Sequence, residues 1–90
     1  MQATAADNPS IIYIDHYGNC VSGLRGANIS HGAFVTLAGH TAPYAETFAA
    51  VAPGQVFWYI NSLGLVEVAV NRGRADTLLG VQVGALIKAR

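Results

Sequence analysis

The chain has 90 residues, with five basic side chains, five acidic side chains and no formal net charge. This length corresponds to one domain, and the charged fraction of 11% is well below the roughly 25% typical of soluble domains. So little charge predicts apolar surface that a partner covers. The absence of a basic patch argues against nucleic acid or an anionic membrane as that partner.

The composition also excludes several kinds of site. Cys20 is the single cysteine, so no internal disulfide and no cysteine-based metal site is expected, which fits the reducing cytoplasm. His16, His31 and His40 lack the spacing of zinc ligands, and no metal site is predicted. The first ten residues lack the basic and apolar regions of a signal peptide, and no apolar run is long enough for a membrane span.

Taken in order, the chain begins with a flexible lead over residues 1–9, followed by a single domain over residues 10–90. Residues 40–43 are predicted to form a loop, residues 44–51 a helical turn or loop, and residues 74–79 a short helix that Gly80 caps. Strands are predicted over residues 11–15, 20–24, 27–30, 34–37, 55–61, 65–71 and 81–89. The pattern indicates an all-β fold, a small antiparallel β-barrel or sandwich of about seven short strands with at most two short helical turns.

Residues 55–71 form the centre of this pattern. Two β-type runs flank the sequence Asn-Ser-Leu-Gly at positions 61–64, which predicts a hairpin with a tight turn. The turn places Ser62 and the backbone of Leu63 where exposed N–H groups bind a carboxylate. The alternative is a hairpin turn with no ligand.

Two further places bear side chains suited to a ligand. Asp15 and Asn19 flank a glycine turn at a strand end, where a carboxylate suits an ammonium group and an amide suits a nucleobase edge. They equally suit a turn stabilised by its own side chains. Tyr44 and Phe48 lie between strands, where an aromatic ring either stacks on a base or packs in the core. No catalytic residue is predicted, because no nucleophile–base arrangement and no phosphate loop is present.

The order of these blocks resembles the C-terminal domain of the S-adenosylmethionine hydroxide adenosyltransferases, the family that includes the fluorinase and chlorinase. The family pattern has an Asp-x-Phe-Gly-Asn turn, a Thr-Tyr/Phe segment, and Asn-Ser-x-Gly-x-Leu/Val-Glu-Ile/Val-Ala followed by Asn-x-Gly. In this chain the blocks lie at residues 15–19, 47–49 and 61–73, and the resemblance covers residues 10–90.

The resemblance implies a trimeric enzyme that needs no cofactor and holds its substrate, S-adenosylmethionine, between the C-terminal domain of one subunit and the N-terminal domain of another. Water attacks C5′ of the ribose and methionine leaves, giving adenosine. The family pattern gives binding roles to Asp15 (methionine ammonium), Asn19 (adenine edge), Phe48 (stacking on adenine), Ser62 with Leu63 (methionine carboxylate), and Val70 with Arg72 (adenine edge, through the backbone).

Two departures from the family limit what this chain is expected to do. The position after Ser62 is Arg in the halogenases and Leu63 here, which argues against halogenation. The N-terminal domain is missing, so the chain by itself is expected to be catalytically silent. Two other functions remain open: a small β-barrel that keeps the fold without the ligand and serves in oligomerisation or regulation, and a nucleic-acid-binding barrel, against which the charge argues.

Overall fold

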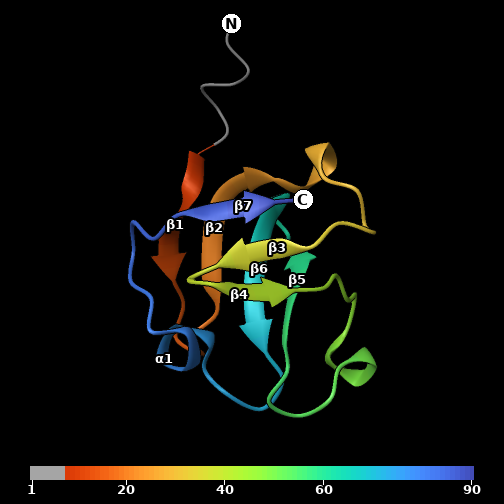
Figure 1. Cartoon of the computed structure of the whole chain (residues 1–90), viewed down its shortest axis with the longest axis vertical. Coiled ribbons are helices and arrows are strands. Elements are labelled where there is room, and N and C mark those ends of the chain that lie inside the picture. The colour runs from red at the N-terminus through yellow and green to blue at the C-terminus, as the bar shows by residue number, and fades with distance from the viewer. Residues whose placement is uncertain (1–7) are drawn as a thin grey trace, which may run out of the picture.

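The computed structural model describes residues 8–90, apart from the side chain of Phe48, and arranges the strands in two antiparallel sheets (Figure 1). The larger sheet has the order β1-β2-β6-β5, and the smaller sheet, which lies in front of it in Figure 1, has the order β4-β3-β7. The strands of the larger sheet are β1 (Asn8–Ile14), β2 (Cys20–Arg25), β5 (Val56–Ile60) and β6 (Leu65–Val70). Those of the smaller sheet are β3 (Val35–Leu37), β4 (His40–Ala42) and β7 (Ile87–Ala89). Most of the lead predicted over residues 1–9, namely residues 1–7, lies outside the described residues.

The main core lies between the two sheets. Alternation along β6 directs Val66 and Val68 into this core and leaves Glu67 and Ala69 on the opposite face of the sheet. Trp58 on β5 is fully buried in the main core, and its indole nitrogen donates to the carbonyl of Ala33 at 3.0 Å. A second, smaller apolar cluster covers the opposite face and consists of Ala45, Val51, Phe57 and Ala69, with Tyr59 packed against it.

Backbone bridges join the two sheets at both edges. Ser10 on β1 pairs with Leu86 just before β7, and Tyr44 after β4 pairs with Trp58 on β5. These contacts are isolated, so the sheets do not close into one continuous barrel. The predicted all-β class is confirmed, in the form of a sandwich.

The central hairpin is also confirmed. β5 and β6 pair antiparallel from Val56 opposite Val70 to Ile60 opposite Val66, and residues 61–64 form the turn. The predicted helix is α1 (Ala75–Leu79), which ends at Gly80 in the left-handed conformation with φ +67°.

The strand predicted over residues 27–30 is wrong. The chain turns there through a 3₁₀ turn (Gly26–Asn28), in which the N–H of Ile29 donates to the carbonyl of Gly26 at 3.0 Å. The N–H of Gly26 is held by the carbonyl of Gly64 at 2.8 Å, and a Cβ on Gly26 would come within 2.4 Å of Ile60. The close approach to the central hairpin, which no local pattern encodes, therefore bends this segment.

Two other element boundaries and the number of helical pieces differ from the prediction. The loop predicted over residues 40–43 contains β4, because Ala38 and Gly39, with φ of +53° and +79°, reverse the chain tightly after β3. Only the end of the strand predicted over residues 81–89 is extended as β7, because Gly84, with φ +101°, lies in a turn that precedes it. A second 3₁₀ turn (Phe48–Ala50) brings the short helical pieces among the described residues to three, rather than at most two.

Candidate functional site

The turn after β1 is built around the Asp15 carboxylate. One carboxylate oxygen, Oδ1, accepts the N–H groups of Tyr17 and Asn19, each at 2.9 Å. Gly18 takes the left-handed conformation that the turn requires, with φ +83°, and donates its N–H to the carbonyl of Asp15 at 3.0 Å. The expected turn-stabilising role of Asp15 is therefore present. Its second carboxylate oxygen accepts no hydrogen bond from the described residues, which leaves it available to a ligand.

Residues at the start of α1 donate hydrogen bonds to the carbonyl groups of this turn. The N–H of Asp76 donates to the carbonyl of Gly18 at 3.0 Å, and the Arg74 guanidinium donates to the carbonyl of His16 at 2.9 Å. Arg74 and Asp76 also form an ion pair at 3.1 Å. This hydrogen-bonded pair holds the pKa of the Asp76 carboxyl below its usual range. The position of Asn19 thus depends on residues more than fifty positions away in the sequence.

A side-chain amide shapes the hairpin turn. Oδ1 of Asn61 accepts the N–H groups of Leu63 at 2.9 Å and Leu65 at 3.0 Å, and the carbonyl of Asn61 accepts the N–H of Gly64 at 2.9 Å. Ser62 and Leu63 are exposed at the tip. The Leu63 N–H is already bonded to Asn61, so the donors that the tip offers to a carboxylate are those of Ser62.

A buried carboxylate lies behind this turn. Glu67 on β6 is only 6% exposed and pairs across the sheet with Tyr59 on β5. Its two oxygens accept the Tyr59 hydroxyl and, at 3.0 Å, the Asn61 side-chain amide. Burial, reinforced by the hydrogen bond to Glu67, raises the pKa of the Tyr59 hydroxyl well above its usual value. Tyr59 therefore stays protonated and acts as a donor to Glu67 throughout the neutral range.

One cleft of about 420 Å³ collects three of the predicted site residues. Asn19, Val70 and Arg72 line it together with Tyr17, Tyr59 and Gly73. β2 and β6 are neighbours in the larger sheet, and this pairing brings the turn before β2 beside the turn after β6. Arg72, with φ +60°, lies in the turn that the bridge between Val70 and Gly73 closes.

A smaller hollow of about 110 Å³ adjoins this cleft through Tyr59, which lines both. Its other walls are Glu46, Thr47 and Phe57. The predicted stacking residue, Phe48, follows Thr47 directly and lies in the second 3₁₀ turn, but its side chain is outside the described part of the structure. Tyr44, the other aromatic candidate, stacks on His31 and contacts the ring of Trp58 edge-on, so it belongs to the packing.

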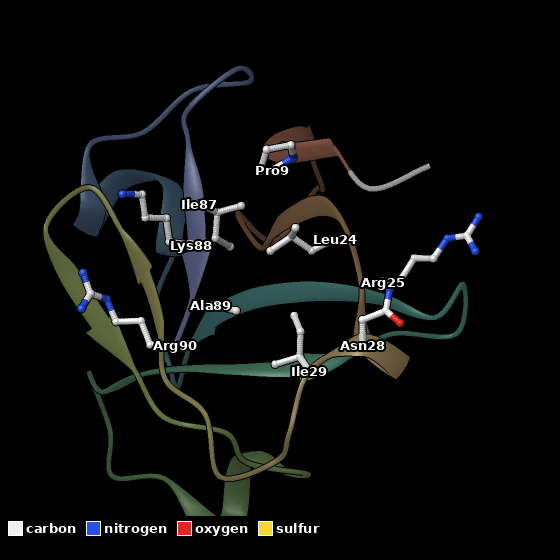
Figure 2. A pocket seen from close by; sticks show the side chains of 9 residues that line it. All are labelled: Pro9, Leu24, Arg25, Asn28, Ile29, Ile87, Lys88, Ala89 and Arg90. Atoms are coloured by element: carbon white, nitrogen blue, oxygen red, sulfur yellow. The ribbon is translucent and has the colours of Figure 1, made fainter. Parts of the chain in front are cut away.

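The cleft in Figure 2 contains none of the predicted site residues. It has a volume of about 490 Å³ and lies between the ends of β1 and β2 and strand β7. Its lining consists of Pro9, Leu24, Arg25, Asn28, Ile29, Ile87, Lys88, Ala89 and Arg90. Figure 2 shows the charged ends of Arg25, Lys88 and Arg90 directed away from its apolar centre. We therefore place the candidate site at Asn19, Tyr59, Val70 and Arg72, where the polar groups converge.

The structure thus brings Asn19, Val70 and Arg72 into one cleft, whereas Asp15, Ser62 and Leu63 do not line it and lie in two ordered turns. Sequence reasoning gave no role to Tyr59 or to Glu67, although the position of Glu67 belongs to the family pattern. The sequence did contain a signal for Glu67, which is the one acid within an apolar run. In a strand, its side chain must lie on the opposite face of the sheet from those of Val66 and Val68. No cluster of three potential metal ligands occurs in residues 8–90, and no helix among them has the length and apolarity to cross a membrane.

The sequence of this chain matches a known family. The family model described as SAM hydroxide adenosyltransferase C-terminal domain matches residues 9–88. The chain is 35% identical over 85 residues to a protein of Thermus thermophilus named (R)-S-adenosyl-L-methionine hydrolase, covering 94% of this chain and 32% of that protein. A protein of the same name from Salinispora arenicola is 39% identical over 75 residues, covering 82% of this chain and 29% of its own length. The chain therefore spans about a third of the length of the curated relatives it matches.

Solved structures share the fold. A conserved hypothetical protein from Thermus thermophilus superposes with a TM-score of 0.82 at 35% identity, covering 92% of this chain and 35% of that one. An uncharacterized conserved protein from Thermotoga maritima superposes with a TM-score of 0.76 at 23% identity, covering 89% of this chain and 34% of its own. The second likeness shows the fold alone.

Proposed function

Because the chain belongs to the family of SAM hydroxide adenosyltransferase C-terminal domains, we propose that it forms the half of a SAM hydrolase site that binds adenine and methionine. The observation that carries this proposal is the shared cleft of Asn19, Val70, Arg72 and Tyr59. These residues come from distant parts of the chain, and the sheet pairing sets their polar groups around one space large enough for a purine.

The proposed adenine end lies at this cleft. The Asn19 amide forms hydrogen bonds to the purine edge. Val70 and Arg72 contribute main-chain groups, and the Val70 side chain itself is buried. Phe48 is proposed to stack on the base, in the role that the family pattern gives to this position.

The proposed methionine end lies at the two turns. The second oxygen of Asp15 attracts the ammonium group, because a carboxylate and an ammonium form a charge-assisted hydrogen bond. The hydroxyl and N–H of Ser62 donate to the methionine carboxylate at the exposed tip beside Leu63. Both turns are fixed by their own internal hydrogen bonds, so little conformational entropy is lost when a ligand binds.

The proposed reaction is attack of water on C5′ of S-adenosylmethionine, with methionine as the leaving group and adenosine as the other product. The carbon–sulfur bond breaks as the carbon–oxygen bond forms, the positive sulfonium takes up the electron pair, and the attacking water releases one proton to solvent. The residues of this chain bind and orient the substrate, and the groups that position the water come from an N-terminal domain, in the trimeric arrangement proposed for the full enzyme. The chain alone is proposed to bind weakly and to be inactive.

The cytoplasm is the proposed compartment, which the buried, free Cys20 supports.

A titration of the ¹⁵N-labelled chain with S-adenosylmethionine, adenosine and methionine in turn tests this proposal by NMR. We expect adenosine to shift the amide signals of residues 15–19, 44–48 and 70–73, and methionine to shift those of residues 15–19 and 61–64. Asn19→Ala and Phe48→Ala should each weaken adenosine binding about tenfold, as loss of one hydrogen bond or one stacked ring does. Lys88→Ala, in the separate cleft of Figure 2, serves as the control. Shifts confined to that separate cleft would refute the assignment.

A further inference from the structure

Glu67 is the one acid among the described residues that the fold buries, and the proposed binding roles leave it unused. It lies on the face of the larger sheet that carries Tyr59, and Val21 and Tyr59 are its cross-strand neighbours. Both of its oxygens are hydrogen-bonded to side chains, those of Tyr59 and Asn61. A carboxylate has only acceptor sites, so each of these neighbours must point a proton toward it.

This requirement fixes the orientation of the hairpin turn. The Asn61 amide nitrogen faces Glu67, so the amide oxygen faces the other way, toward the N–H groups of Leu63 and Leu65. A flipped amide would set two donors against those two N–H groups. The buried carboxylate thus selects the one Asn61 orientation that closes the turn carrying Ser62.

Because the neighbours of Glu67 must donate to it, the positions of donors and acceptors in the cleft are also determined. The Tyr59 hydroxyl proton points toward Glu67, so the lone pairs of the Tyr59 oxygen remain for a donor on the cleft side. The Asn19 side chain lines the same cleft and bonds to the Tyr59 oxygen, and because the Tyr59 proton is already donated to Glu67, an N–H of Asn19 must be the donor. The Asn19 amide oxygen is then left for the ligand. An acceptor in this position pairs with an exocyclic amine and repels a carbonyl oxygen.

We propose that Glu67 is a positioning residue, whose buried carboxylate orients Asn19 through Tyr59 and the Ser62 turn through Asn61, and so makes the site selective for 6-aminopurines over 6-oxopurines. This inference rests on the proposed function, because it assigns the specificity of the same site. Glu67 does not touch the ligand. It acts by setting which atoms of other residues face the ligand.

Glu67→Gln separates this role from simple packing. Asn61 is tied to Leu63 and Leu65, so the oxygen of the introduced amide keeps the bond to Asn61 and its NH₂ group turns toward Tyr59. The Tyr59 proton must then point into the cleft, and the Asn19 amide flips to accept it. We expect adenosine to bind about tenfold more weakly and inosine to bind more tightly than in the wild type, the change associated with one hydrogen bond. Tyr59→Phe should abolish this dependence, so that Glu67→Gln no longer changes the adenosine-to-inosine ratio in that background.

The experiment measures dissociation constants of adenosine and inosine by NMR titration, and amide hydrogen exchange of Leu63 and Leu65 without ligand. Glu67→Ala should speed the exchange of both amides, whereas Glu67→Gln should leave them protected. Lys88→Gln, which makes a charge change of equal size in the separate cleft, should alter neither readout. An unchanged adenosine-to-inosine ratio in Glu67→Gln, with the wild type binding adenosine, would overturn the inference and leave the proposed function standing. A wild type that binds neither nucleoside would overturn the proposed function, and unchanged exchange in Glu67→Ala would overturn the role of Glu67 in the turn.

Discussion

Gly18, in the turn that precedes Asn19, is the residue next to the candidate site whose substitution has the clearest physical consequence. It has φ +83°, and an added Cβ would lie 2.6 Å from Oδ1 of Asp76 and 2.7 Å from Cβ of Arg74. Gly18→Ala therefore combines a left-handed backbone, which costs an L-residue about 1 kcal/mol, with a steric clash of the overpacking kind, which costs about 1–3 kcal/mol. We expect the free energy of unfolding to fall by about 3 kcal/mol and the melting temperature to fall by roughly 12–24 °C for a domain of this size.

Gly39→Ala is the matched control. Gly39 has φ +79°, nearly the same backbone conformation, but its Cβ would meet nothing within 4 Å. Only the conformational cost of about 1 kcal/mol applies, so the melting temperature should fall by roughly 4–8 °C. Urea and thermal unfolding followed by Trp58 fluorescence measure both variants. Equal losses of stability in the two variants would refute the clash with the segment at the start of α1 as the reason that position 18 requires glycine.

Binding at the candidate site provides a second measurement for the same substitution. Gly18 precedes Asn19, and its carbonyl accepts the N–H of Asp76 at 3.0 Å. Displacement of this turn moves the Asn19 amide, and misplacement by about an ångström is enough to weaken a hydrogen bond severely. We expect Gly18→Ala to weaken adenosine binding at temperatures where the domain is still folded, whereas Gly39→Ala leaves it intact. Undiminished adenosine binding by Gly18→Ala would show that the turn does not position Asn19.

Three further predictions concern single residues. Burial, followed by the nearby acidic side chains, raises the pKa of the Cys20 thiol to about 11, so iodoacetamide at pH 8 should label the folded chain very slowly, and rapid stoichiometric labelling would contradict this. The Asp76 carboxyl has a lowered pKa because of Arg74, so its small stabilisation is present above the unfolded pKa of about 4 and disappears as the pH falls through the folded value. Urea unfolding should then distinguish Asp76→Asn from the wild type at pH 7 but not at pH 2, and a difference of the same size at both pH values would refute the assignment. Trp58→Phe removes the bond to the Ala33 carbonyl and should lower the free energy of unfolding by about 1–3 kcal/mol without changing ligand shifts, while unchanged stability would show that this buried bond contributes nothing.

The site was predictable only as a set of separate blocks. Asp15, Asn19 and Ser62 were predicted as candidates from residue type and order, and each of them lies in a turn. That Asn19 shares a cleft with Val70 and Arg72 depends on the pairing of β2 with β6, which joins Cys20 to Val68 across 48 positions of sequence. Strand order of this kind is decided by packing between distant segments, so no local pattern contains it.

The sequence by itself determined the all-β class, the central hairpin and the short helix that ends at Gly80, because strand alternation, turn residues and caps are local properties of the chain. Tertiary structure alone decided that residues 26–28 turn against Ile60 and that residues 40–42 form a strand. It also placed the Glu67 carboxylate between Tyr59 and Asn61. The hydrogen-bonding needs of a buried acid are met by whichever groups the fold brings near it, and those groups become known only when the sheets are assembled.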